Sequence, residues 1–198
     1  MVFDLLSSLI LVVKNFFLLI IFPYRTMRKI SRESDYGQIF ILFFIIFLYF
    51  KFAYFLRDKP YPATYTFLVF FLHFSLTVAF FYGLSRVADN KIKLSSFIFT
   101  LSYSFIPSLI WFASSSLLYI FVPPPRSLTL LGKGFSIFFI AYSVSLLSWK
   151  AILMYLALRF SARAGFYRII YMLVLFLLWF IPYSVLLYHL KLFRIPFI

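Results

Sequence analysis

The segment Tyr36–Leu56 decides the fold. It reads YGQIFILFFIIFLYFKFAYFL and contains one charged residue, Lys51. Roughly 20 consecutive apolar residues in an α-helix cross the ~30 Å hydrocarbon layer of a bilayer, and this segment is that long. A soluble fold would have to bury nearly all of these side chains, whereas lipid tails solvate them. The segment therefore predicts a membrane-spanning helix.

Four more segments of the same kind follow along the chain. We expect spanning helices over residues 64–84, 95–122, 134–158 and 166–190, with short connections that carry proline, glycine or asparagine. The third segment is the longest, and Pro107 within it predicts a bend. The sequence thus predicts an all-α fold, a polytopic membrane helical bundle of five transmembrane helices. Residues 1–198 form one domain, in which 36–190 are the bundle and 191–198 a short tail.

The composition of the whole chain agrees with this class. Of the 198 residues, 65% are hydrophobic and 12% are charged, and the mean hydropathy is +1.03. Soluble domains carry about 25% charged residues. A soluble domain of this size could not bury so much apolar surface, and a disordered chain would lack it. Because the chain has no cysteine, disulfides and thiolate metal sites are excluded.

The residues before the first span have a different pattern. Residues 3–22 are nearly long enough to cross a bilayer, but polar side chains recur on a helical arc of about 120°. These side chains are Asp4, Ser7, Ser8, Lys14 and Asn15. A helix that lies in the membrane interface separates polar from apolar residues in this way. Residues 1–35 are therefore expected to hold an N-terminal amphipathic interfacial helix and a basic cytoplasmic segment, and a sixth span is the alternative.

Basic residues indicate the orientation. The chain has 19 Lys and Arg against five acidic residues, a formal charge of +14. They lie between apolar segments, which favours anionic lipid headgroups and topology signals over nucleic acid. With a cytoplasmic N-terminus, the inner side would carry Arg25, Arg28, Lys29, Arg32, Arg86, Lys91, Lys93, Arg159, Arg163 and Arg168. The outer side would carry Arg57, Lys59, Arg126, Lys133, Lys191 and Arg194.

This excess of inner bases favours a cytoplasmic N-terminus and, after five spans, an extracytoplasmic C-terminus. The first cluster comes directly before the first span, where basic residues have their strongest effect on topology. We expect it to contact anionic headgroups or partner membrane proteins. Its members are Arg25, Arg28, Lys29 and Arg32.

The acidic residues are as informative as the basic ones. Asp4, Glu33, Asp35, Asp58 and Asp89 all lie outside the expected spans. This argues against proton- or sodium-coupled transport, which uses carboxylates within the membrane. No metal-ligand spacing, nucleophile motif or glycine-rich phosphate loop occurs, so we expect no enzyme activity, no metal and no cofactor.

A few polar residues do fall inside the expected spans. Lys51 is close enough to the end of its span to reach the interface, whereas Lys150 is either a snorkelling lysine or an anion site. His73 is expected to donate a hydrogen bond between helices. Two helical faces of small and hydroxyl residues predict close helix packing. They consist of Thr100, Ser104 and Ser108, and of Ala141, Ser145 and Ser148.

Taken in order, several motifs resemble the Yip1 domain family of small multi-pass membrane proteins. FPYRTMRKI precedes the first span, SSFIFTLSYSFIP resembles the family's third span, and WKAILMYLALRFSARAGF resembles its fourth. The matching residues are Tyr103, Pro107, Trp149, Ala157 and Ser161. The acidic motif and the long cytosolic arm of the eukaryotic branch are missing, so Rab GTPase binding does not carry over. The resemblance implies a prokaryotic member in the cell (inner) membrane, with this fold and topology and no settled activity.

Two function classes follow. The first is a non-catalytic scaffold, adaptor or accessory subunit that organises membrane components, in contact with anionic lipid headgroups and with other membrane proteins or copies of itself. The alternative is a small permease or channel subunit for a small or anionic solute, with Lys150, His73, Ser104 and Ser108 along its path. A lipid-modifying enzyme ranks below both, because it would need convergent polar groups at headgroup level.

Overall fold

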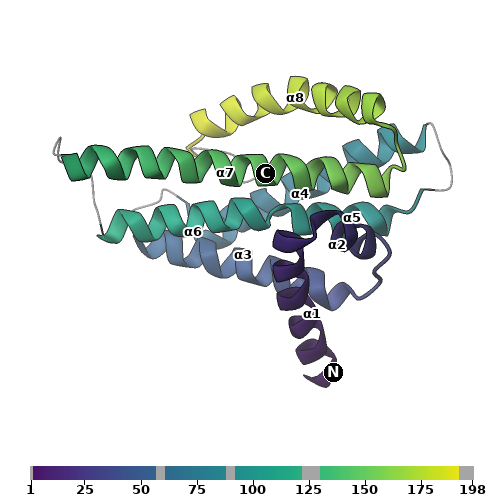
Figure 1. Ribbon diagram of the computed structural model, residues 1–198, viewed down its shortest axis with the longest axis horizontal. Coiled ribbons are helices and arrows are strands. Elements are labelled where there is room, and N and C mark those ends of the chain that lie inside the picture. Colours follow the sequence, from purple (N-terminus) through teal and green to yellow (C-terminus); the bar gives the residue numbers. More distant parts are fainter. Residues whose placement is uncertain (1, 57–60, 88–91, 122–129, 192–198) are drawn as a thin grey trace.

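The computed structural model describes residues 2–56, 61–87, 92–121 and 130–191, and in these residues the chain is helical without β-strands. The helices are α1 (Val2–Ile21), α2 (Pro23–Ile30), α3 (Tyr36–Leu56), α4 (Ala63–Arg86), α5 (Leu94–Ser104), α6 (Ile106–Phe121), α7 (Leu130–Ser161) and α8 (Phe166–His189). The long helices follow the long axis of the molecule (Figure 1).

Five stretches are long and apolar enough to cross a membrane. They are Tyr36–Leu56, Ala63–Arg86, Leu94–Leu118, Gly132–Ser161 and Phe166–His189. The predicted all-α bundle with five spanning helices is therefore confirmed, and the protein is an integral multi-pass membrane protein. The boundaries agree with the sequence because hydropathy along one helix depends on its own residues.

The third span is broken into α5 and α6 at Phe105. Pro107 has no amide hydrogen, so the carbonyl of Tyr103 cannot receive the usual helical hydrogen bond from it, and the proline ring crowds that carbonyl. The chain tightens there, and the Phe105 amide donates to the Ser102 carbonyl at 3.3 Å. The predicted bend is present, two residues before the proline that causes it.

Helix α1 lies across the bundle instead of along it (Figure 1), which is the direction of a helix in the plane of the membrane. Apolar side chains such as Leu6, Ile10 and Phe17 are exposed on it. The buried polar residues Ser8 and Asn15, however, face the protein and not the headgroups. Ser8 and Asn15 of the polar arc thus attach α1 to the bundle, whereas Ser7 and Lys14 of the same arc are exposed.

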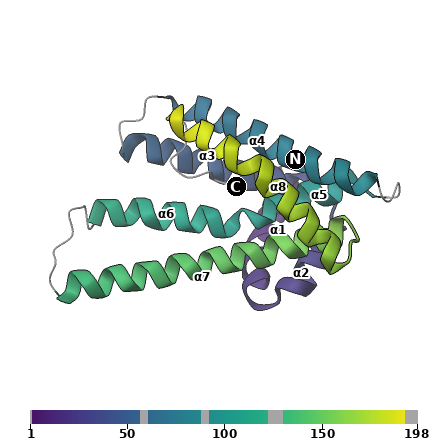
Figure 2. The same ribbon diagram turned by 90° about the horizontal axis from the view of Figure 1, so that it is seen from above.

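The two ends of the bundle differ in packing. At the end that carries α1 and α2, α5 crosses α7 closely, and Leu153, Ala157 and Leu158 of α7 are buried. Toward the other end, α6 and α7 diverge from α4 and α8 (Figure 2), while α6 stays in contact with α3, where the Tyr49 and Ser116 hydroxyl groups lie 3.2 Å apart. The predicted packing face of α7 is wrong, because Ala141, Ser145 and Ser148 lie on that diverging part and are exposed.

Candidate functional site

A polar pocket of about 530 Å³ lies at the packed end of the bundle. Four parts of the chain meet there: the end of α2 with its following turn, the start of α5, the end of α7 and the turn before α8. The basic residues that line it are Arg28, Arg32, Lys93, Arg159 and Arg163. The hydroxyl residues are Ser31, Ser34, Ser95, Ser96 and Ser161, and the one acidic residue is Glu33. We call this site the basic pocket.

Helix α2 is held in place by its apolar face. Met27 and Ile30 are fully buried, and the Thr26 hydroxyl donates to the carbonyls of Leu18 and Phe22 at the corner between α1 and α2. With that face fixed, Arg28 and the following turn are turned toward the pocket. Helix α2 and the turn after it therefore form one wall of the basic pocket.

The start of α5 forms the opposite wall. Lys93 precedes the helix in an extended conformation, and no side chain caps the helix end. The first amide N–H groups of a helix have no carbonyl partner within the helix and carry a partial positive charge. Ser95 and Ser96 of this first turn line the pocket. Such a helix start, with basic side chains beside it, is suited to an anion.

The end of α7 is joined to α5 by hydroxyl groups. The Ser96 Oγ donates to the Ser161 Oγ at 3.1 Å, and the Thr100 Oγ1 and the Ser161 Oγ are hydrogen-bonded at 2.7 Å. One turn earlier Ala157 is fully buried, so the two backbones approach closely. This crossing holds Arg159 and Arg163 in register with the α5 wall.

The turn after α7 has an unusual backbone at Arg163. Its φ of 49° lies in the left-handed region, which a residue with a Cβ adopts only at a cost of about 1–2 kcal/mol. The turn reverses the chain between Ser161 and Phe166 and leaves Arg163 beside the pocket with Arg159. Strained residues of this kind are found more often at functional sites than elsewhere.

The predicted cluster before the first span divides in two. Arg28 and Arg32 line the basic pocket. Arg25 is exposed and its guanidinium lies 6.0 Å from the centre of the Phe22 ring, while the Lys29 Nζ lies 3.7 Å from the Glu33 Oε1. The other three pocket bases were predicted only as topology signals. The sequence signal that could have linked them to the pocket was that the positive-inside rule assigns all three to the same side of the membrane.

A network of buried polar side chains lies where α1, α3 and α5 meet. The Tyr103 hydroxyl donates to the Gln38 Oε1 at 2.6 Å, and the Asn15 Nδ2 donates to the same oxygen at 3.3 Å and to the Tyr103 hydroxyl at 3.2 Å. At its edge the Ser8 hydroxyl donates to the Asp35 Oδ2 at 2.7 Å. This network joins α1, α3 and α5, and it explains why the family-motif residue Tyr103 is buried.

Of the polar residues predicted inside the spans, His73 lies apart from the cavities that border Lys150. His73 stacks on Tyr183 with ring centres 5.0 Å apart and packs against Phe180. Neither of its ring nitrogens has a hydrogen-bond partner among the residues that the structure describes. The predicted hydrogen bond from His73 is therefore wrong, because its imidazole packs among the aromatic rings of α8, Trp179, Phe180 and Tyr183.

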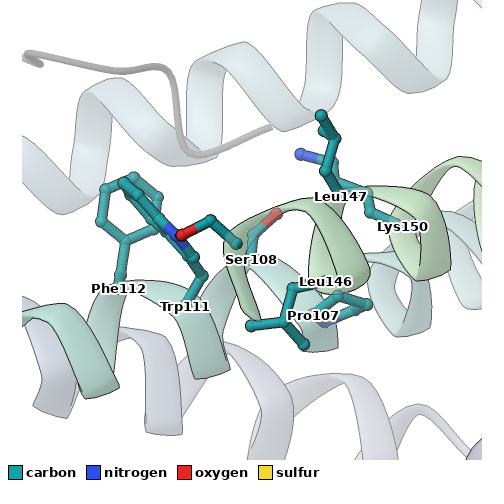
Figure 3. A pocket seen from close by; sticks show the side chains of 8 residues that line it. Pro107, Ser108, Trp111, Phe112, Leu146, Leu147 and Lys150 are labelled. Carbon is teal, nitrogen blue, oxygen red and sulfur yellow. The ribbon is translucent and has the colours of Figure 1, made fainter. Parts of the chain in front are cut away.

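The other intramembrane candidates, Ser104 and Ser108, each line a cavity that Lys150 also lines. Lys150, Ser108 and Pro107 line a cavity of about 230 Å³ between α6 and α7 (Figure 3), and Lys150 and Ser104 line a second cavity of about 300 Å³. Ser104 itself donates to the Leu101 carbonyl. Of the remaining family-motif positions, Trp149 packs against the edge of the core.

Lys51 is exposed on α3, where its Nζ lies 5.5 Å from the centre of the Phe47 ring. The predicted structural role of this lysine agrees with that position, since it is near the end of the helix.

Comparison with family models, with curated proteins and with solved structures finds no match. The resemblance to the Yip1 domain family therefore stays a prediction.

The basic pocket offers positive charge, hydroxyl groups and a helix start. Across the described parts of the chain, no three His or acidic residues come together as metal ligands.

Proposed function

We propose that the protein is a non-catalytic membrane scaffold or accessory subunit that binds anionic lipid headgroups in the basic pocket. The observation that carries the proposal is that five basic side chains, five serines and an uncapped helix start surround one pocket with a single acidic residue. Guanidinium groups bind phosphate through paired, charge-assisted hydrogen bonds. A bound headgroup would join α2, α5 and α7 and present a defined surface to neighbouring proteins.

The position of the pocket supports a lipid phosphate over a free one. The pocket lies at an end of the spanning helices, and the apolar residues Phe160 and Ala164 are part of its lining. Beside it, α1 presents exposed apolar side chains such as Ile20 and Ile21. Headgroups lie at this level of a membrane.

In the proposed orientation the pocket faces the cytoplasm and the C-terminus lies outside, in the cell membrane of a prokaryote. All five pocket bases belong to the set that the positive-inside rule places on the inner side. The cytoplasmic leaflet carries anionic lipids, to which each basic residue near the surface adds about 1 kcal/mol of attraction. The resemblance to the Yip1 domain family implies the same topology.

The alternative of a permease or channel subunit has weaker support. It would need a polar path along the bundle, but the two cavities that border Lys150 are lined mainly by apolar side chains such as Leu147 and Phe176. His73 lies outside both.

Native mass spectrometry of the purified protein in a nonionic detergent tests the proposal. We expect phosphatidylglycerol and cardiolipin to bind and phosphatidylcholine not to bind. The double variant Arg159→Gln/Arg163→Gln should lose about tenfold or more in affinity for the anionic lipids, since two charge-assisted contacts are removed.

The matched control is Arg25→Gln/Arg86→Gln. It removes the same charge from exposed residues at the same end of the bundle but outside the pocket. Equal loss of affinity in both variants would contradict a specific site. Displacement of the lipids by millimolar inorganic phosphate would instead indicate a free anion as ligand. The scaffold role is tested separately by crosslinking in native membranes, where recovery of the chain only as a free monomer would contradict it.

A further inference from the structure

Lys150 is a positive charge inside the membrane-spanning part of α7. It is half-buried, and the apolar segment 134–158, which is the expected span, continues beyond it for about 12 Å. A lysine side chain has a four-carbon stem, which is too short to cover that distance to the interface. Snorkelling along α7 therefore does not bring the ammonium group to the headgroups.

Among the described residues, no carboxylate is paired with this charge. Glu33 and Asp35 are engaged elsewhere, with Lys29 and with Ser8, and no ion pair to Lys150 occurs within the described parts of the chain. Charged side chains inside a membrane are costly, and they usually have a partner or mark a binding site. Within the described ranges, the ammonium group of Lys150 thus has no charged partner of the kind that its position calls for.

The space around Lys150 has room for such a partner. One cavity lies between α6 and α7, with the Ser108 side chain on the helix facing Lys150 (Figure 3). The second lies between α7 and α8, with α4 and α5 also contributing to its wall, and its mainly apolar lining includes Leu173, Phe176 and Leu177. Lys150 and Leu147 belong to both linings. A ligand could place its anionic group at Lys150 and its apolar part in the second cavity.

We infer that Lys150 binds the carboxylate of a single-chain lipid, that is, a long-chain fatty acid, whose chain lies between α7 and α8. The ammonium group of Lys150 and the hydroxyl group of Ser108 supply donors to the carboxylate. The surrounding apolar residues hold the acyl chain.

Three observations select this ligand class. A single basic residue, Lys150, beside the hydroxyl groups of Ser108 and Ser143 suits a monovalent carboxylate, whereas the basic pocket has the several guanidinium groups that favour phosphate. The cavities of about 230 and 300 Å³ are at or below the lower end of the usual size for ligand sites, which favours one chain over a two-chain phospholipid. Leu147 and Leu177 are 66% and 49% exposed, so the walls reach the lipid-facing surface and the ligand can enter from the bilayer.

The test uses the full chain in nanodiscs of phosphatidylcholine and a 16-carbon fatty acid with a photoactivatable diazirine in its chain. After irradiation, we expect mass spectrometry to find the label on peptides of α7 and α8. Lys150→Met should reduce this labelling about tenfold or more, because the charge-assisted contact is lost. Lys51→Met is the matched control, since it removes another lysine of a spanning helix, and it should keep the wild-type labelling.

A competition experiment on the unmodified protein makes the test independent of any variant. Excess palmitic acid should abolish the labelling, whereas its methyl ester and acetate should not. Equal labelling of Lys150→Met and the wild type, or equal competition by the ester, would overturn the inference. Loss of the label in Arg159→Gln/Arg163→Gln with retention in Lys150→Met would assign the fatty acid to the basic pocket and also overturn it. Failure of the phospholipid experiment above leaves this result unaffected.

Discussion

The third and fourth spans have similar hydropathy and opposite surroundings. An 18-residue stretch of Leu94–Leu118 has a mean hydropathy of 1.5 and is 67% buried, whereas one of Gly132–Ser161 has 1.8 and is 6% buried. In water the more apolar helix would be the more buried one. In lipid, apolar side chains gain little by leaving the acyl chains, so association depends on close packing and hydrogen bonds.

This difference in burial follows from where the small and hydroxyl residues that pack helices together are located. Helix α5 contributes the buried hydroxyls of Thr100, Ser102 and Ser104 together with Tyr103. The part of α7 that it crosses contributes Ala157 and the hydroxyl of Ser161. In the first part of α7, the Ser143 hydroxyl accepts a hydrogen bond from the Trp111 indole of α6, but the small and hydroxyl residues Ala141, Ser145 and Ser148 are exposed.

The largest effect is expected from breaking the polar network that attaches α1 to α3 and α5. Gln38→Leu removes the acceptor of both the Tyr103 hydroxyl and the Asn15 amide, and it leaves buried donors with fewer partners. We expect the free energy of unfolding to fall by about 2–3 kcal/mol. Equilibrium unfolding in mixed micelles measures it. Phe44→Leu, at an exposed position of the same helix, should leave stability nearly unchanged, and a similar loss there would refute the assignment.

The second prediction compares the two parts of α7 with one type of substitution. Ala157→Leu adds volume where α5 and α7 are in close contact, so it should lower the free energy of unfolding by about 2 kcal/mol. Ala141→Leu makes the same change on the exposed part and should stay within about 0.5 kcal/mol of the wild type. Both values come from the same unfolding experiment. Comparable losses at the two positions would show that the first part of α7 is packed in the membrane, for example against a second protein.

The smallest effect concerns the turn at Arg163, where stability and binding should change in opposite directions. Arg163→Gly relieves the left-handed backbone and should raise the free energy of unfolding by about 0.5–1 kcal/mol. The same variant removes a base of the basic pocket, so binding of phosphatidylglycerol should weaken. Native mass spectrometry and unfolding of one preparation measure both. Weaker binding without a gain in stability would indicate that the backbone at Arg163 is not strained.

Much of the fold could be predicted from local sequence features. The five spans follow from runs of apolar residues, and the break at Phe105 follows from Pro107. The direction of α1 followed from its polar arc, although Ser8 and Asn15 of that arc face the bundle and not the headgroups. Of the intramembrane candidates, Lys150 and Ser108 do share a cavity, whereas the predicted hydrogen bond of His73 is replaced by ring stacking.

The basic pocket was harder to predict from the sequence than the fold. Arg28 and Arg32 were singled out beside Arg25 and Lys29, but nothing in the linear order separates the pair that lines the pocket from the pair that does not. Which helices meet depends on shape and on a few hydroxyl and small residues, such as Ser96 and Ser161, whose partners are about 65 positions away.

The sequence alone determined that this is a membrane protein and how many times its helices can cross the bilayer, because apolar length acts segment by segment along the chain. Only the tertiary structure decided which basic residues surround one pocket, which hydroxyl groups join α5 to α7 and which face of α7 stays open. Those outcomes depend on helix–helix contacts between distant segments, and in lipid such contacts leave no signature in hydropathy.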